Sequence, residues 1–141
     1  MLDGLFVTPA LTAVTEALRS ANADGALAVI GNAKLADGLE AVPVGLSARA
    51  AKKRPAALPD LSSIEAGSLA GVVGIDVATD DAWAQTLAAW ARVVRDGGAL
   101  VFVDRGHAAE ASRRALCAGL TEIEQRRAGR LVITSGLVSH L

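Results

Sequence analysis

The chain has 141 residues, 52% of them hydrophobic, and a formal net charge of −1 from 14 basic and 15 acidic side chains. This length fits one domain over residues 1–141. The near-neutral charge and the small number of aromatic residues argue against nucleic acid as a partner. A single cysteine and two separated histidines exclude an internal disulfide and a zinc site of recognisable spacing.

The sequence carries no sign of a membrane or secretory segment. No apolar run reaches the roughly 20 residues that a membrane span requires, so we expect no membrane association. The segment "MLDGLFVTPA" lacks a basic start and has Asp3 where a secretory signal would have Lys or Arg. We therefore expect a cytoplasmic protein.

Capping residues and apolar runs predict the elements in chain order. The first helix is expected to begin with Thr8 as N-cap and Pro9 as the first helical residue, and to end near Asn22. Apolar runs bounded by glycine and aspartate predict the strands, at residues 26–31, 41–46, 70–76, 99–104, 120–126 and 130–137. Because Pro43 cannot donate a ladder hydrogen bond, the second strand is expected near a sheet edge.

Two segments between these strands are less regular. After Gly31 and Asn32 the sequence reads as an alanine-rich turn, and residues 48–66 show no period longer than one helical turn. We leave the structure of residues 48–66 undetermined. The terminal segment breaks at Ala128-Gly129 and alternates in polarity, which predicts an antiparallel hairpin.

Two later helices have clearer signals. The first is expected to start with Thr79 or Asp80 as its cap and to stop at Gly97-Gly98, with Trp83 and Trp90 on one core-facing stripe. The second follows His107, and its single cysteine, Cys117, is interpreted as a small core residue.

Strand, helix, strand and a closing hairpin together predict an α/β fold. We expect a Rossmann-like open sheet, mostly parallel, with an antiparallel C-terminal hairpin strand and helices on both faces. The segments that define this order are "LAGVVGIDV", "WARVVRDGGALVFVD" and "TEIEQRRAGRLVITSG". From Leu69 to Val138 they resemble the fourth strand, the helix with its paired-glycine turn and fifth strand, and the closing hairpin of class I S-adenosylmethionine-dependent methyltransferases.

The resemblance also implies where the cofactor would lie. In that family the first strand carries an acidic residue and leads into a loop of three alternating glycines, which lets the backbone approach the cofactor. On this sequence Gly31 matches the first glycine, but Ala33 and Leu35 stand at the other two positions. The acidic position falls on Val29, and Ser47 stands where the family has an acid for the ribose. We therefore expect Leu35 and Ala33 to obstruct the site, and no cofactor to be held with ordinary affinity.

If S-adenosylmethionine does bind, the resemblance assigns its contacts to Gly31, Asn32, Ser47 and Asp76, at the carboxyl ends of the strands. Asp76 has an alternative interpretation as a turn or helix-capping carboxylate. We expect no metal site.

Two further residues are candidates for acid–base chemistry near a methyl acceptor, namely Asp104 and His107 in the segment "DRGH". A histidine can act as a general base near neutral pH. The alternative is that His107 is a solvated residue at the start of a helix.

The run "RAAKKR" at residues 49–54 carries four positive charges. It lies just after the second strand, where an arginine of dinucleotide-binding folds can accommodate a phosphate. The alternative is a solvated helix face.

Three functions remain open from the sequence. The first is a degenerate, shortened methyltransferase-like domain that acts by binding a protein partner or a second copy of itself. The simplest assembly is a twofold dimer through the terminal hairpin or an apolar helix face. The terminal segment "RLVITSGLVSHL" supports the dimer, since we expect a monomer to expose its apolar residues. The second is an active small-molecule methyltransferase, and the third is a nucleotide-binding Rossmann-like module.

Overall fold

A computed structural model describes residues 4–140, with side chains from residue 9 onward. The helices are α1 (Gly4–Ser20), α2 (Ala33–Leu39), α3 (Ala48–Ala51), the 3₁₀ helix η1 (Val77–Thr79), α4 (Trp83–Val93) and α5 (Ala108–Cys117). The strands are β1 (Leu27–Ile30), β2 (Val42–Val44), β3 (Leu69–Ile75), β4 (Val94–Asp104), β5 (Thr121–Ala128) and β6 (Leu131–Leu137).

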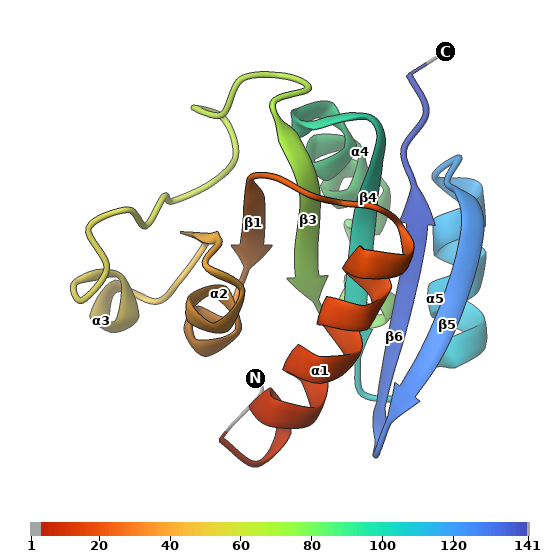
Figure 1. Cartoon of the computed structure of the whole chain (residues 1–141), viewed down its shortest axis with the longest axis horizontal. Helices are drawn as coiled ribbons and strands as arrows, with labels where there is room; N and C mark the ends of the chain where they lie inside the picture. Colours follow the sequence, from red (N-terminus) through yellow and green to blue (C-terminus); the bar gives the residue numbers. More distant parts are fainter. Residues whose placement is uncertain (1–3, 141) are drawn as a thin grey trace.

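The strands form one six-stranded sheet in the order β2-β1-β3-β4-β6-β5 (Figure 1). The strands β2, β1, β3 and β4 run parallel, and β6 is antiparallel to both β4 and β5. In the register of the central pair, Val73 lies opposite Val101. The predicted parallel neighbours at residues 70–76 and 99–104 and the antiparallel last strand are therefore confirmed.

Helices cover both faces of the sheet, with α1 and α2 on one side and α4 and α5 on the other (Figure 1). Successive residues of a strand point to opposite faces. Accordingly, Val73 and Val101 pack in the core beneath α1, whereas Val72 and Leu100 pack in the core beneath α4. This two-sided burial explains why the central strands are continuous apolar runs.

A glycine in the central strand β3 makes room for a tryptophan of α4. A Cβ atom at Gly74 would overlap the ring of Trp90. The ring also meets Phe102 of β4 edge to face, with 6.1 Å between the ring centroids. Trp90 is 4% exposed, so its predicted core position is confirmed.

The first two helices differ from the prediction. Helix α1 begins at Gly4 and contains Pro9, so the expected N-cap at Thr8 is wrong. A Thr-Pro pair marks a helix start only where the preceding residues are not helical, and here they are. Residues 33–39 form helix α2 and not a turn, because the side chain of Asn32 accepts a hydrogen bond from Leu35 N and so caps the helix.

The paired glycines lie inside a strand and do not end the preceding helix. Helix α4 ends at Val93, and β4 begins at Val94. The pairing with β3 shifts register between Leu69 and Gly71, opposite the glycines. A Cβ atom at Gly98 would come 2.6 Å from the carbonyl oxygen of Ala70, so the close approach of the two backbones requires glycine there.

The start of α4 also lies later than expected, because η1 precedes it. The helix begins at Trp83, and its N-cap position is Ala82. Asp80 nevertheless contributes to this end of the helix, since its carboxylate accepts hydrogen bonds from Ala82 N at 2.8 Å and from Thr86 Oγ1 at 2.7 Å. One of the two predicted capping residues therefore contacts the helix start.

The undetermined segment lies beyond β2 at the edge of the sheet. It contains α3 and one bridge, in which Leu58 pairs in parallel with Val44. Leu58 N donates to Pro43 O, and Gly45 N donates to Leu58 O, each at 2.9 Å. The prediction that Pro43 lies near a sheet edge is confirmed, since β2 is the outermost strand on this side.

The terminal hairpin is packed within the chain. Strand β6 lies between β4 and β5, and Leu131 and Ile133 are fully buried. The expectation that a monomer would expose these residues is wrong, because β5 and α1 cover them. The prediction of a dimer thus loses this support, and the oligomeric state stays a prediction.

Cys117 is exposed, so its expected core position is wrong; it is the last residue of α5. Among residues with described side chains, Leu116 is the only exposed large hydrophobic residue. None of the described helices is long and apolar enough to cross a membrane.

Candidate functional site

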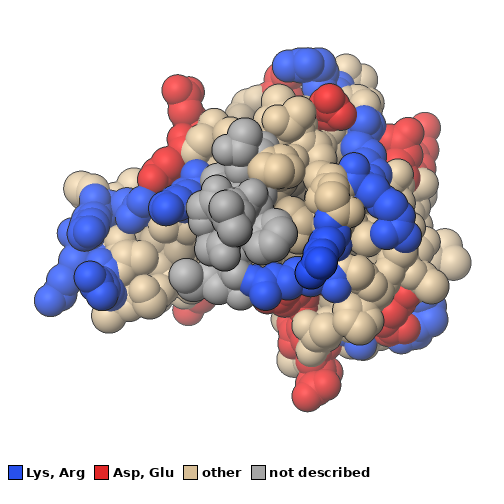
Figure 2. Space-filling model, turned by 90° about the horizontal axis from the view of Figure 1, so that it is seen from below, with Lys and Arg blue, Asp and Glu red and all other residues tan. Residues whose placement is uncertain are grey.

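The carboxyl ends of the parallel strands lie at one edge of the sheet, which Figure 2 shows face on. Strand β1 ends before Gly31, β3 before Asp76, and β4 at Asp104. Ligands of open α/β sheets bind at this edge. The edge is therefore the expected location of a ligand-binding site.

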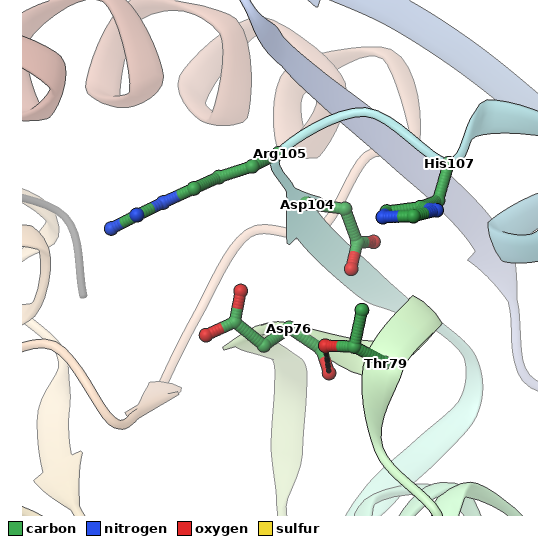
Figure 3. A pocket seen from close by; sticks show the side chains of 5 residues that line it. All are labelled: Asp76, Thr79, Asp104, Arg105 and His107. Carbon is green, nitrogen blue, oxygen red and sulfur yellow. Dashed lines mark hydrogen bonds between the residues drawn. The ribbon is translucent and has the colours of Figure 1, made fainter.

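A pocket of about 240 Å³ opens between the ends of β3 and β4 (Figure 3). Its lining side chains come from the residues after β3, from η1, and from the β4–α5 turn: Asp76, Thr79, Asp104, Arg105 and His107. Three candidates from the sequence, Asp76, Asp104 and His107, thus lie around one cavity.

Asp104 is the buried acid of the pocket, with 1% of its surface exposed. Its Oδ1 accepts a hydrogen bond of 2.8 Å from Ala78 N, and its Oδ2 has no partner among the described residues. Burial raises the pKa of Asp104 above its ordinary value, and the nearby Asp76 adds to the increase. The Ala78 N–H, His107 and Arg114 oppose it.

Asp76 is exposed at the mouth of the pocket, and its backbone is left-handed with φ of 59°. Its N–H donates to Val103 O at 2.9 Å, which ties the end of β3 to β4. The side chain makes no capping hydrogen bond within the described residues. The interpretation of Asp76 as a helix-capping carboxylate is therefore wrong, whereas its left-handed backbone is that of a turn residue. Its carboxylate faces the pocket (Figure 3).

His107 is at the N-cap position of α5 with φ of 58° and caps nothing with its side chain in the described chain. Its ring points toward the carboxylate of Asp104, whereas the side chain of Arg105 extends away from it (Figure 3). Both His107 and Arg105 are exposed. The arrangement places an imidazole beside a buried carboxylate at the pocket wall.

Arg114, on α5, holds the wall of the pocket in place. Its Nη1 donates to the carbonyl oxygens of Val77 at 2.6 Å and Asp80 at 2.9 Å. Its Nε donates to Glu110 one turn earlier, and its guanidinium lies 5.4 Å from the centroid of the Trp83 ring. The arginine thus connects α5 with η1 and α4.

The role of Arg114 is not evident from the sequence. The visible signal was the spacing of Glu110 and Arg114, which places them on one face of a helix. Hydrogen bonds from Arg113 and Arg114 lower the pKa of Glu110 to about 2.

The residues that the resemblance assigns to the cofactor lie outside this pocket, except for Asp76. Gly31 has φ of 85°, so the turn after β1 uses the conformational freedom of glycine. Asn32 is 5% exposed and caps α2, and the Ser47 hydroxyl accepts a 3.3 Å hydrogen bond from Ala50 N at the start of α3. Their predicted cofactor contacts stay predictions.

Two residues that differ from the family's pattern at the first strand and its loop lie in the hydrophobic core of this chain. The Leu35 side chain is fully buried in the cluster beneath α1, and Val29 lies in the same cluster. The branched side chain of Leu35 is therefore held by the core, which removes the reason for expecting it to obstruct the cofactor. At the end of β1 no carboxylate replaces Val29, and at β2 only the hydroxyl of Ser47 is available, so the acidic contacts of the family do not fit here.

The basic run lies on and after α3, beside the same edge. Arg49, Lys52 and Lys53 are exposed, and Arg54 forms a 2.6 Å ion pair with Asp37. Lys and Arg side chains gather over this segment at the left of Figure 2. Across the described part of the chain, no group of three or more His, Cys, Asp or Glu residues could hold a metal ion.

Comparison with known structures identifies the fold. The chain is similar to an S-adenosylmethionine-dependent methyltransferase from Thermotoga maritima, with a TM-score of 0.77 and 15% identity over 94% of this chain and 89% of that one. It is also similar to the N-methyltransferase NodS from Bradyrhizobium japonicum, with a TM-score of 0.68 and 16% identity over 98% of this chain and 99% of that one.

A third similar structure is the 1,6-didemethyltoxoflavin-N1-methyltransferase from Burkholderia thailandensis, which contains bound S-adenosylhomocysteine. Its TM-score is 0.66, with 13% identity over 92% of this chain and 78% of that one. No protein-family profile and no curated sequence matches the chain. The protein has a class I methyltransferase-like, Rossmann-like fold, as the sequence predicted.

Proposed function

We propose that this methyltransferase-fold domain acts by binding a small polar molecule in the pocket between β3 and β4. In this proposal S-adenosylmethionine is not bound with the affinity of an ordinary methyltransferase. The observation that carries the binding role is the buried carboxylate of Asp104, whose Oδ2 has no partner among the described residues. A native protein rarely leaves such a group unsatisfied without a ligand, ion or water to meet it.

The weak affinity for the cofactor rests on the two missing acids. Val29 is buried in the core, and Ser47 offers a hydroxyl that already caps α3. One hydrogen bond to a charged group contributes about 1.5–3 kcal/mol, so the loss of two lowers affinity by a hundredfold or more.

Isothermal titration calorimetry with S-adenosylmethionine and S-adenosylhomocysteine tests this proposal. A methyltransferase that holds either molecule at micromolar strength gains about 8 kcal/mol of binding free energy. We expect no saturable heat with either compound at that strength. Micromolar binding of either one would overturn the proposed loss of the cofactor.

An active small-molecule methyltransferase is the second candidate, and one observation favours it. Gly31 keeps its positive φ, and Leu35 packs into the core beneath α1, so neither residue argues against a cofactor at the turn after β1. In this candidate Asp104 or His107 would move the proton of the acceptor. Transfer of a labelled methyl group from S-adenosylmethionine to any acceptor would establish it.

A scaffold role through a protein partner or a homodimer has less support from the surface. Leu116 is the only exposed large apolar side chain among those described. The edge strand β5 carries the sequence "TEIEQRRA", whose charges oppose pairing with another strand. Analytical ultracentrifugation tests the dimer, and a concentration-dependent shift to twice the monomer mass would restore it.

A further inference from the structure

We propose that the pocket between β3 and β4 recognises a protonated amine, with Asp104 as the residue that contacts the ammonium group. This inference rests on the proposed function, because it names the chemical class of the ligand that the pocket binds. It does not depend on whether S-adenosylmethionine binds elsewhere on the edge.

The unpartnered oxygen of Asp104 indicates a donor as the complementary group. Oδ1 already accepts from Ala78 N, whereas Oδ2 makes no hydrogen bond within the described chain although the residue is 99% buried. An ionised carboxylate only accepts hydrogen bonds, and a buried one needs donors to offset its loss of water. An ammonium group supplies both donors and a positive charge.

The charges around the pocket favour a cation over an anion. A second carboxylate, Asp76, faces the same cavity from the end of β3 (Figure 3). Arg114 cannot neutralise the pair by direct contact, because its guanidinium bonds to Glu110 and to two carbonyl oxygens of the η1 segment. Arg105 extends away from Asp104 (Figure 3). An anion would face two carboxylates in the pocket lining, and like charges repel.

Other parts of the pocket suit an organic ammonium better than a metal ion. Besides the two carboxylates, the lining contributes Thr79, Arg105 and His107. No cluster of three metal-ligating side chains exists in the described residues. An organic amine needs only one or two carboxylates, and the Thr79 hydroxyl and the His107 ring can contact the rest of the molecule.

A matched series of three probes tests the inference. Benzylamine, benzyl alcohol and benzoate share a ring of a size suited to a pocket of about 240 Å³ and differ in charge. Titration would be followed by nuclear magnetic resonance of the Ala78 amide, because this amide donates to Asp104 and reports on its carboxylate. We expect benzylamine to shift this resonance in a saturable manner and to bind more tightly than the other two.

Three substitutions separate recognition from structure. Asp104→Asn should weaken benzylamine binding by about tenfold or more, since it removes a charged hydrogen bond. Asp76→Asn should weaken it less, and asparagine tolerates the left-handed backbone there. Asp81→Asn, also exposed but outside the pocket lining, is the matched control and should leave binding unchanged. Circular dichroism checks that each variant is folded. If Asp104→Asn does not fold, Asp76→Asn still tests the inference.

The outcomes distinguish the inference from the proposed function. Equal binding of all three probes, tighter binding of benzoate, no binding of benzylamine, or benzylamine binding insensitive to both pocket substitutions would overturn the amine specificity. A fragment library of cations, anions and neutral polar molecules would then test the pocket itself. If no member shifts the Ala78 resonance, the proposed binding function fails as well.

Discussion

Removal of the Arg114 side chain should destabilise the protein far more than removal of its neighbour Arg113. Both arginines contact Glu110, and both guanidinium groups lie over the Trp83 ring, at 5.4 Å for Arg114 and 5.7 Å for Arg113. Only Arg114 also donates to the backbone carbonyls of the η1 segment. Arg113→Ala is therefore a matched control that isolates these two hydrogen bonds.

The magnitude follows from the contacts. A hydrogen bond from a charged donor contributes about 1.5–3 kcal/mol. The Arg114 side chain is 13% exposed, so solvent screens it little. With the lower value for each carbonyl bond and about 0.5 kcal/mol for the contact with Trp83, Arg114→Ala should lower the free energy of unfolding by about 3.5 kcal/mol. The Arg113 side chain is 54% exposed, and an exposed ion pair contributes less than about 1 kcal/mol.

Urea denaturation monitored by tryptophan fluorescence measures both losses. Hydrogen exchange of the Ala78 amide gives a second readout, because that amide lies in the η1 turn that Arg114 holds. We expect faster exchange in Arg114→Ala and parent-like exchange in Arg113→Ala. Equal losses of stability in the two variants would refute the reasoning, since the carbonyl bonds would then contribute nothing.

Three further substitutions test other parts of the structure. Glu110→Gln should lower the thermal midpoint near neutral pH. The pKa of Glu110 is lowered to about 2, so its stabilisation is present above the ordinary value of 4.5 and is lost as the pH falls through about 2. An equal difference between the midpoints of the parent and the variant near neutral pH and near pH 2 would contradict this. Gly74→Ala should cost about 1–3 kcal/mol in urea denaturation, because the added methyl group overlaps the Trp90 ring, and an unchanged midpoint would show that the ring moves freely. Asp104→Asn should gain stability relative to the parent as the pH rises from about 4 to about 7: burial raises the pKa of Asp104, so its favourable contribution is present below 3.8 and is lost as the pH rises through the folded value. A constant difference in stability between parent and variant across that range would show that the charged Asp104 carboxylate does not destabilise the fold.

The strands could be predicted from the sequence because burial on both faces leaves a continuous apolar run. The segment "LAGVVGI" of β3 is an example, and its parallel partner in β4 followed from the same pattern. Helix α2 was missed because its seven residues are too few to show a helical period. Asn32, a favourable N-cap residue, was the available signal.

The site was predictable only in part. The rule for strand ends brought Asp76, Asp104 and His107 to one edge, and the structure places them around one pocket. The role of Arg114 could not be read from the sequence, because its acceptor Val77 O lies 37 positions earlier in the chain. Such a contact depends on how α5 packs against η1, which no local pattern encodes.

The single bridge at Leu58 also affects how this sheet behaves toward other molecules. The sheet stops there after one residue of pairing, and the next residue, exposed Pro59, has no N–H to offer a further strand. An unprotected rim of backbone donors and acceptors would template edge-to-edge aggregation. Pro59 at this rim and the charged side chains of β5 at the opposite rim oppose such growth from both sides. We therefore expect this sheet to resist the addition of strands from other molecules.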